Sequence, residues 1–434
     1  AGDGFDPVQV FPEGDRDLRE GADPCYKCSA CDTNCPVAEV DDDFPGPKFQ
    51  GPEQWRLTRK GDRDIDPTIM DCSNCMRCDD ACPAGVPLSQ MHNEARAEYV
   101  EGMSRFSRTY WRNRLLANYR RIAGLASRMP RLSNRVLDSK LTRWVNEHLL
   151  GITGERSFPA FAGQTFREWY HERGGIEESR RRARAARESD SERGKQVAYF
   201  HGCYANYNTP EVAKALVRVY ESFGYEVAVP NQGCSGTPMF ANGMLSDARA
   251  DAETNVRSLG ALVADGYDVV CSCTSCSLSL RQEYPELFAF EGVDRVADNT
   301  YEAIEYLRIS ENLRAALRDG ELTGPEFPRT YAYHAPCHAR NQGLGRQTRE
   351  LFRDVAGATV ADVGDSCSGI SGTYGWKAEK YDTSMAIGAE MFEEMTAVEG
   401  EIGLTECPTC AMQMEHGTGY DVRHPLELLE ATLV

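Results

Sequence analysis

Short apolar runs alternate with longer amphipathic stretches over the second half of the chain, from about residue 194 onward. The stretches at 211–223 and 246–265 repeat apolar residues at helical spacing, so they predict helices. The runs between them are rich in Val, Tyr and Ala, which predicts strands. These runs lie at 196–200, 225–229, 267–270, 330–334, 358–363 and 401–404. Strands that alternate with helices in this way favour α/β units with a largely parallel sheet.

A second pattern, between Met103 and Leu150, combines an apolar stripe with many arginines. The stripe predicts two helices, one before Pro130 and one after it. Its residues are Trp111, Leu115, Tyr119, Ile122, Leu125, Ala126 and Met129, and then Leu132, Val136, Leu137, Leu141, Trp144, Val145 and Leu149. Such helices lie on membrane surfaces or bind acidic partners. The alternative is that the apolar side packs on the next domain and the arginines are solvated.

The charge of this segment contrasts with that of the rest of the chain. The 434 residues include 48 Lys and Arg against 67 Asp and Glu, a formal net charge of −19, yet 103–150 carries +9. The acidic balance disfavours binding to nucleic acid. Only eight basic residues are lysine, which suggests a halophilic-like acidic protein, although GC-rich codon usage would give the same bias.

No targeting or membrane-spanning pattern is evident. The first residues, AGDGFDPVQVFPEGD, lack the charged and apolar regions of a signal peptide. No apolar run approaches the ~18 residues of a transmembrane helix. We therefore expect neither a signal peptide nor a transmembrane helix.

Two cysteine runs near the N-terminus have the same spacing. CYKCSACDTNCP and CSNCMRCDDACP both match C-x2-C-x2-C-x3-C-P. In two-cluster ferredoxins this run binds [4Fe–4S] clusters, and the fourth cysteine of each run ligates the other cluster. Zinc is the alternative, but zinc sites usually use separated C-x2-C pairs. We therefore assign one electron-relay cluster to Cys25, Cys28, Cys31 and Cys82, and the other to Cys72, Cys75, Cys78 and Cys35.

Eight further cysteines recur in two copies of one unit. HGC, GCSG and CTSC in the first copy match HAPC, SCSG and CPTC in the second, at offsets of 133 or 134 residues. This agreement indicates an internal duplication. We expect these cysteines at the C-terminal ends of the strands, where open α/β sheets bind ligands. The predicted metal ligands are Cys203, Cys234, Cys273 and Cys276, and then Cys337, Cys367, Cys407 and Cys410.

Each of these sets suits an iron–sulfur cluster, zinc, or a redox dithiol at its C-x2-C pair. The ferredoxin-type runs elsewhere in the chain favour the first. His201, His334 and His338 flank the cysteines, and we expect them to form hydrogen bonds rather than to bind metal. Cys271 occurs only in the first copy and is interpreted as a small buried residue. We find no nucleophile–base constellation, so no catalytic residue is predicted.

Together these patterns predict an α+β fold in four parts. Residues 1–100 form a helical, two-[4Fe–4S] ferredoxin-like domain, and 101–193 form the basic amphipathic helical region and a linker. Residues 194–327 and 328–434 form two duplicated α/β cysteine-rich repeats.

Further stretches resemble a known family. They are FPGPK at 44–48, FHGCYANYN at 200–208, ANG at 241–243, YHAPCH at 333–338, GTYGWK at 372–377 and SMAIGAEMF at 384–392. With the cysteine runs they make the chain similar to the iron–sulfur subunits of heterodisulfide reductases and of glycolate and lactate oxidases. The resemblance to the C subunits of anaerobic glycerol-3-phosphate dehydrogenases is stronger still, from about Pro24 to the end of the chain.

This resemblance implies an electron carrier that lies peripherally on the cytoplasmic side of the membrane. A flavoprotein subunit would oxidise glycerol 3-phosphate, and this chain would pass the electrons to a quinone. The expected cofactors are two N-terminal [4Fe–4S] clusters and one or two further clusters in the repeats. FAD is expected on the partner, because the chain lacks a G-x-G-x-x-G fingerprint and a substrate-oxidising site of its own. Contact with the membrane is expected through 103–150.

The chain departs from the family at one position in each repeat. Relatives usually carry Cys-Cys-Gly there, whereas this chain has Ser235 and Ser368 in place of the second cysteine. A hydroxyl is a poorer ligand for iron than a thiolate, so a disulfide-cleaving centre is disfavoured, while four cysteines suffice for a cubane cluster. The alternatives are a thiol–disulfide reductase subunit, a subunit of a glycolate or lactate oxidase, and a scaffold that tethers a dehydrogenase.

Overall fold

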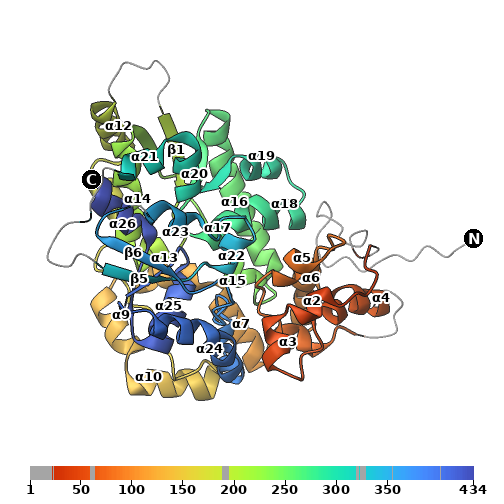
Figure 1. Ribbon diagram of the computed structural model, residues 1–434. Coiled ribbons are helices and arrows are strands. Elements are labelled where there is room, and N and C mark those ends of the chain that lie inside the picture. The colour runs from red at the N-terminus through yellow and green to blue at the C-terminus, as the bar shows by residue number, and fades with distance from the viewer. Residues whose placement is uncertain are drawn as a thin grey trace, which may run out of the picture.

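The computed structural model describes residues 22, 24–58, 64–187, 195–318, 322, 329–353, 355–400 and 402–434. The segment AGDGFDPVQVFPEGD and the expected boundaries at 193–194 and 327–328 lie outside these residues. Within the described ranges, no helix combines the length and the apolar composition needed to cross a bilayer. Figure 1 shows the N-terminal helices as a lobe beside a larger body that contains both repeats.

The lobe consists of short helices around the two cysteine runs. Cys35 is the N-cap of α3, and Pro36 takes the first helical position, where the missing N–H of proline costs no hydrogen bond. In the second run Cys82 instead ends α5, and the next helix begins only at Leu88. The elements are α2 (Ala30–Thr33), α3 (Pro36–Val40), η1 (Phe49–Glu53), α4 (Gln54–Thr58), η2 (Pro67–Asp71), α5 (Arg77–Ala81) and α6 (Leu88–Glu101).

The predicted stripe is helical, but its helices are shorter than expected. The first is divided at Asn118 into α7 (Arg108–Ala117) and α8 (Tyr119–Ala126). The second is divided into α9 (Pro130–Leu137), α10 (Lys140–Val145) and η3 (Asn146–Leu150). One reason is local capping, because the Ser139 hydroxyl accepts from Thr142 N and so starts a new helix at α10. The helices α11 (Phe166–Glu172) and α12 (Gly175–Ala186) lead to the first repeat.

Each repeat contains a four-stranded parallel sheet with the same strand order, β2-β1-β3-β4 and β6-β5-β7-β8. The six predicted strands are confirmed within the described residues as β1 (Lys195–Phe200), β2 (Tyr225–Ala228), β3 (Asp268–Cys271), β5 (Arg329–Tyr333), β6 (Ala358–Asp362) and β7 (Ile402–Leu404). The edge strands β4 (Thr300–Glu302) and β8 (Asp421–Arg423) were not predicted, because three residues are too few for a pattern. The identical order supports the duplication.

Helices cover both sheets, and the two predicted ones are confirmed as α14 (Pro210–Ser222) and α16 (Leu245–Ala264). The first repeat also contains α13 (Tyr204–Tyr207), α15 (Thr237–Phe240), α17 (Thr274–Leu278), η4 (Ser279–Glu283), α18 (Tyr284–Leu287), α19 (Val293–Asp298), α20 (Ala303–Ser310) and α21 (Leu313–Arg318). The second contains α22 (Cys337–Arg340), α23 (Gln347–Phe352), η5 (Tyr374–Trp376), η6 (Ala378–Lys380), α24 (Tyr381–Ala397), α25 (Pro408–Thr418) and α26 (Pro425–Leu433).

One hydrophobic core runs through both repeats. It includes Val197 and Leu216 from the first repeat and Tyr333 and Leu404 from the second, all fully buried. Burying one such side chain contributes about 1.5–3 kcal/mol. Helix α14 packs along α26 at this junction. The two repeats therefore form a single body rather than two independent domains.

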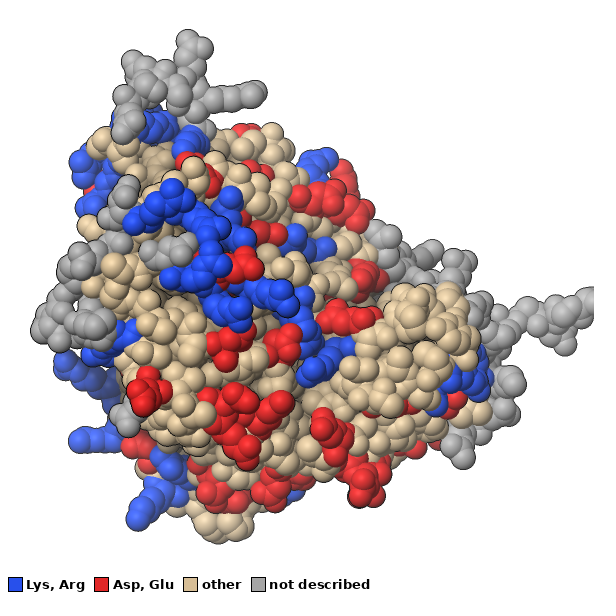
Figure 2. All heavy atoms as spheres, viewed as in Figure 1, with Lys and Arg blue, Asp and Glu red and all other residues tan. Residues whose placement is uncertain are grey.

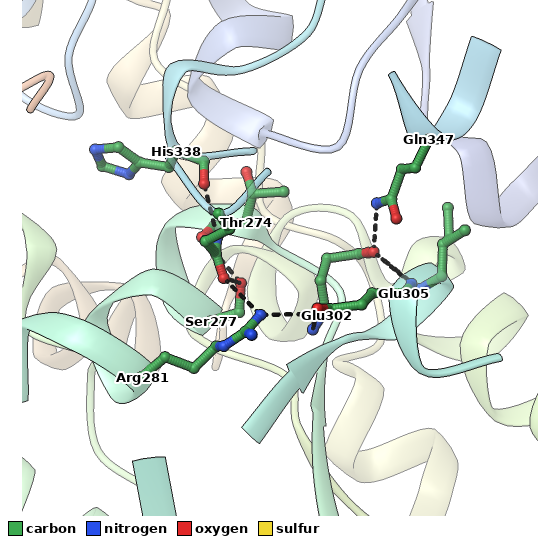
Figure 3. Close-up of polar contacts among 9 residues, drawn as sticks. Thr274, Ser277, Arg281, Glu302, Glu305, His338 and Gln347 are labelled. Atoms are coloured by element: carbon green, nitrogen blue, oxygen red, sulfur yellow. Dashed lines mark hydrogen bonds and ion pairs between the residues drawn. The ribbon is translucent and has the colours of Figure 1, made fainter. Parts of the chain in front are cut away.

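A polar network also joins the repeats beside the sheet ends (Figure 3). Gln342 of the second repeat donates its Nε2 to the Thr274 carbonyl at 3.0 Å, and its Oε1 accepts from Arg281 at 3.2 Å. Gln347 donates to the buried Glu302 carboxyl at 2.6 Å. Buried polar groups of this kind fix the alignment of the two repeats.

We expect Glu302 to make stability depend on pH. Burial, and then the nearby Glu406, raises the pKa of Glu302 from its ordinary value of 4.5 to about 8. The folded chain then binds a proton that the unfolded chain releases between these values, so stability falls as pH rises through this window. The loss is about 1.4 kcal/mol per pH unit for one proton.

The variant Glu302→Gln keeps an acceptor and stays neutral. Its melting temperature should exceed that of the wild type at pH 8 and approach it at pH 5. Glu399→Gln, at an exposed position, is the control and should follow the wild type. A constant difference between E302Q and the wild type across this range would contradict the assignment.

Candidate metal centres

The two N-terminal cysteine runs pack together so that each group of thiols takes its fourth member from the other run. Site I consists of Cys25, Cys28, Cys31 and Cys82, which line one small hollow. Site II consists of Cys72, Cys75, Cys78 and Cys35, which influence one another electrostatically. Burial, and then the charge of Cys75, raises the pKa of Cys35 to about 12. This grouping agrees with the prediction that the fourth cysteine of each run belongs to the cluster of the other run.

Both runs adopt the same unusual loop. Lys27 and Ser29 flank Cys28, Asn74 and Met76 flank Cys75, and all four have φ between 56° and 63°. Left-handed backbone costs about 1–2 kcal/mol for residues other than glycine. Turns that alternate hand in this way point successive backbone N–H groups inward, a geometry found at iron–sulfur and anion sites. The same costly loop in both runs therefore fits a cluster inside each.

Two basic side chains from α6 support site II. His92 Nδ1 lies 3.5 Å from Cys72 Sγ, and its Nε2 lies 3.0 Å from the Pro47 carbonyl. Burial raises the pKa of Cys72, but His92 and Arg96 together lower it overall. The fully buried Arg96 donates to the Cys72 carbonyl at 3.1 Å. These two residues, four positions apart on one helix face, were not identified from the sequence.

The repeat cysteines form two further groups. Site III consists of Cys203, Cys234, Cys273 and Cys276, and site IV of Cys337, Cys367, Cys407 and Cys410. All eight line one cavity of about 470 Å³ between the repeats. Cys273 and Cys407 are the N-caps of α17 and α25, just beyond the ends of β3 and β7. The cysteines thus gather at the sheet edge at which they were expected.

The donor sets fit iron–sulfur clusters. Each of the four groups supplies four thiols, and a [4Fe–4S] cluster takes one thiolate on each iron. Across the part of the chain that the structure describes, no three His, Cys, Asp or Glu side chains converge as tightly as a single metal ion requires. A cluster, whose ligands are spread over four irons, does not need that convergence.

Sites II, IV and III are connected in that order, and site I lies in the same lobe as site II. Cys75 of site II and Cys367 of site IV share a hydrogen bond, which is the main reason that the pKa of Cys75 is lowered to about 6. Cys407 of site IV shares another with Cys273 of site III. The thiol contacts therefore link the N-terminal lobe to the second repeat, whereas its helix α6 also packs on the first repeat, where Arg96 donates to the Phe240 carbonyl at 3.1 Å.

Ser235 and Ser368 occupy equivalent places in the two repeats. The Ser235 hydroxyl lies 3.4 Å from Cys276 Sγ, and the Ser368 hydroxyl lies 3.4 Å from Cys410 Sγ. Each serine therefore contacts the last cysteine of its own group. This is the position at which Cys-Cys-Gly relatives would carry a further thiol.

The histidines near the repeat cysteines are buried. His201 and His338 line the cavity, whereas His334 does not. Burial lowers the pKa of His201 to about 3 and that of His334 to about 4, so both are neutral. His338 Nδ1 lies 2.9 Å from the Ser275 hydroxyl. Cys271 is fully buried in β3 and does not line the cavity.

Three of the stretches that resemble the known family, ANG, GTYGWK and SMAIGAEMF, contain no predicted metal ligand. Their side chains form hydrogen bonds between distant parts of the chain. Asn242 of ANG donates to the Thr373 hydroxyl of GTYGWK at 2.7 Å, across the two repeats. Ser384 of SMAIGAEMF accepts from the buried Arg156 at 3.1 Å. Sequence reasoning missed these roles because each partner lies more than a hundred residues away.

The helices α7 to η3 direct their apolar side outward and part of their polar side inward. Arg112 is buried and pairs with Glu379, with 2.7 Å between its Nη1 and Oε2, while Arg120 donates to the Gln232 carbonyl. The exposed apolar residues are Phe106, Trp111, Leu115, Ile122, Leu125, Met129, Leu132, Val136, Leu141, Trp144 and Leu149, which we call the apolar face. The alternative in which this side packs on the next domain is wrong.

Basic side chains accompany the apolar face. Figure 2 shows Lys and Arg projecting at the lower left edge, where Figure 1 places α9 and α10. Burying one large apolar side chain contributes about 1.5–3 kcal/mol. The eleven side chains of the apolar face are exposed instead, so together they form a large apolar surface without a partner among the described residues.

Comparison with known proteins supports these sites. Residues 21–86 match the model of a 4Fe-4S dicluster domain, and residues 197–281 and 331–415 each match the model of a cysteine-rich domain. The chain is 33% identical to the C subunit of the anaerobic glycerol-3-phosphate dehydrogenase of Escherichia coli, over 94% of this chain and 98% of that protein. It is 25% identical to the D subunit of a heterodisulfide reductase of Methanosarcina barkeri, over 62% and 64%. It is also 25% identical to lactate utilization protein A 1 of Bacillus mycoides, over 54% and 96%.

The exchanged fourth cysteines give a direct test of sites I and II. We expect Cys82→Ala to remove the same EPR signal as Cys31→Ala, and Cys35→Ala to remove the same signal as Cys78→Ala. The reason is that each pair belongs to one spatial group although its members come from different runs. Cys271→Ala, outside every group, is the control and should keep all signals. Matching spectra for Cys35→Ala and Cys31→Ala would contradict the exchange.

Proposed function

Because the chain belongs to the family of the C subunits of anaerobic glycerol-3-phosphate dehydrogenase, we propose that it carries electrons from a flavoprotein subunit to a quinone. Oxidation of glycerol 3-phosphate to dihydroxyacetone phosphate on the partner releases two electrons and two protons. Reduction of a quinone to its quinol consumes the same number. FAD supplies the substrate chemistry on the partner, and this chain moves only electrons.

The observation that carries the proposal is the continuous series of thiol groups. Site II contacts site IV through Cys75 and Cys367, and site IV contacts site III through Cys407 and Cys273. Iron–sulfur clusters, when bound, supply one-electron carriers at these positions. The sixteen cysteines that we propose as ligands are those of sites I to IV. A chain that needed only a structural metal would have no use for groups in contact.

The exposure of site I supports it as the end that receives electrons. Cys28 and the adjoining Tyr26 are exposed, whereas Cys75 and Cys78 of site II are buried. A partner flavin must approach a carrier closely, and site I offers the Cys28 thiol at the surface. We therefore propose that the flavoprotein docks around Tyr26 and Cys28.

The apolar face supports attachment to the cytoplasmic surface of the membrane. Helices with exposed Trp and Leu and flanking basic residues bind anionic bilayers in the interface, without crossing them. The inward hydrogen bonds of Arg112 and Arg120 fix the helices to the protein, so that the apolar side stays available. The quinone would then be taken from the same membrane.

A thiol–disulfide reductase is the second candidate, because both repeat thiol groups line a single cavity. Ser235 and Ser368 weigh against it, since each stands where a further thiol would be needed.

Anaerobic co-expression with the flavoprotein subunits tests the donor and the acceptor. We expect glycerol 3-phosphate to reduce the clusters, followed by EPR, and decyl-ubiquinone to re-oxidise them. In the isolated chain, dithionite-reduced clusters should also be re-oxidised by decyl-ubiquinone. Reduction of a small-molecule disulfide by the chain, with no reaction toward quinone, would instead favour the second candidate.

Vesicle flotation tests the membrane surface. Leu125 is 67% exposed on α8, and we expect Leu125→Glu combined with Leu141→Glu to reduce binding to vesicles that contain phosphatidylglycerol by tenfold or more. The control is Ile309→Glu, because Ile309 is 68% exposed but lies on α20, away from the apolar face. Equal flotation of all three proteins would overturn the assignment.

A further inference from the structure

The cavity between the repeats extends beyond the two thiol groups that it contains. It reaches from sites III and IV to the inner side of α7 and α8 and to the segment before α11. Its far wall is apolar and aromatic, and consists of Leu116, Tyr119, Phe158, Pro159 and Trp376. The volume of about 470 Å³ belongs to the whole cavity, with the space around the eight thiols included. The two thiol groups do not account for this apolar part of the cavity.

Aromatic contacts hold this wall in place. The Phe158 and Trp376 rings are stacked with their centroids 5.0 Å apart. The Tyr119 ring is stacked on Phe161, and its hydroxyl donates to Asn208 Oδ1 at 2.7 Å. The wall therefore has little freedom to collapse into the cavity, and it presents flat apolar surfaces suited to a planar ring.

The wall and the apolar face belong to the same two helices. Leu116 is 8% exposed and lines the cavity, whereas its neighbour Leu115 lies on the apolar face. On α8, Tyr119 lines the cavity while Ile122 is exposed. A single layer of helices thus separates the cavity from the surface that we assign to the membrane. An apolar molecule that leaves the membrane has only this layer to pass.

Four buried residues that line the same cavity have polar atoms without partners among the described residues, namely Asn74, Thr405, His201 and His338. Neither the Nδ2 nor the Oδ1 of Asn74, which is 5% exposed, has a hydrogen-bond partner among the described residues. The Thr405 hydroxyl, in a residue that is 2% exposed, also lacks one there. An unpaired buried polar group costs about 1–3 kcal/mol, so a ligand that accepts hydrogen bonds would be stabilised. A carbonyl oxygen meets this requirement.

We infer that this cavity binds the ring of the quinone. The apolar wall contacts the ring, and Asn74 and Thr405 donate hydrogen bonds to its carbonyl oxygens. The inference rests on the proposed function, because it locates the quinone that this function requires. The thiols of sites III and IV, the last two in the series, line the same cavity as the bound ring.

Narrowing the cavity at Leu116 tests this location. In the dithionite-reduced chain with its clusters, we expect Leu116→Trp to slow re-oxidation by decyl-ubiquinone at least tenfold, and Leu116→Phe to slow it less. Re-oxidation by ferricyanide, which needs no apolar site, should stay within twofold of the wild type. The control is Ile309→Trp, which adds the same indole at an exposed position on α20. Iron content and EPR spectra should match in all four proteins.

A photoreactive azidoquinone gives a readout that does not depend on electron transfer. It should label the wild-type chain in peptides that contain Leu116 or Phe158, and Leu116→Trp should lose this labelling. If L116W loses iron, L116F is used in its place, provided that its EPR spectra match those of the wild type. Its re-oxidation by decyl-ubiquinone and its labelling are then compared with those of the wild type.

The outcomes separate this inference from the proposed function. If decyl-ubiquinone fails to re-oxidise the wild type at all, the quinone acceptor itself is wrong. If it re-oxidises the wild type and both Leu116 variants equally, with labelling elsewhere, the function stands and the cavity is not the quinone site.

Discussion

The contact between Cys75 and Cys367 links site II of the N-terminal lobe to site IV of the second repeat, and the order of the sites depends on it. It brings a thiol of the N-terminal lobe within hydrogen-bonding distance of a thiol in the second repeat. Other contacts hold the same loop, because Asn341 donates to the Cys75 carbonyl at 3.4 Å and Ser371 donates to the Ser73 carbonyl. Arg340 pairs with Asp80 at 3.2 Å on the rim. In the proposed series, electrons that enter the lobe pass from site II to site IV of the second repeat before they reach site III.

This order gives the duplicated repeats different roles. The two repeats share strand order, cysteine spacing and a serine beside the last cysteine. Among the described residues, hydrogen bonds between thiols link the lobe to the second repeat and, through Cys273 and Cys407, the second repeat to the first. In the proposed series, the duplication supplies two equivalent thiol groups, of which site IV is the intermediate and site III the terminus.

Cysteine spacing and apolar runs allowed much of the fold and of the sites to be predicted. The exchange of Cys35 and Cys82, the duplication and six strands follow from short-range patterns that are visible in one sequence. The breaks at Asn118 and Ser139 were not predicted, because a helical period does not reveal where a helix ends. The Ser139 hydroxyl caps the next helix, whereas Asn118 makes no side-chain cap. The sequence also did not reveal which side of α7 and α8 packs on the protein. The helical spacing of apolar residues defines two faces but does not show which of them is buried. The buried side was settled by Arg112 and Glu379, which are 267 residues apart.

The order of the sites is most directly tested by EPR of the anaerobically reduced chain. Cys410→Ala should disrupt site IV, and Cys276→Ala should disrupt site III. The account predicts that C410A also changes the line shape of the site II signal, because magnetic coupling between neighbouring clusters is lost, while C276A leaves that signal unchanged. A site II signal altered by C276A but not by C410A would show that site II couples to site III rather than to site IV, and would contradict the account.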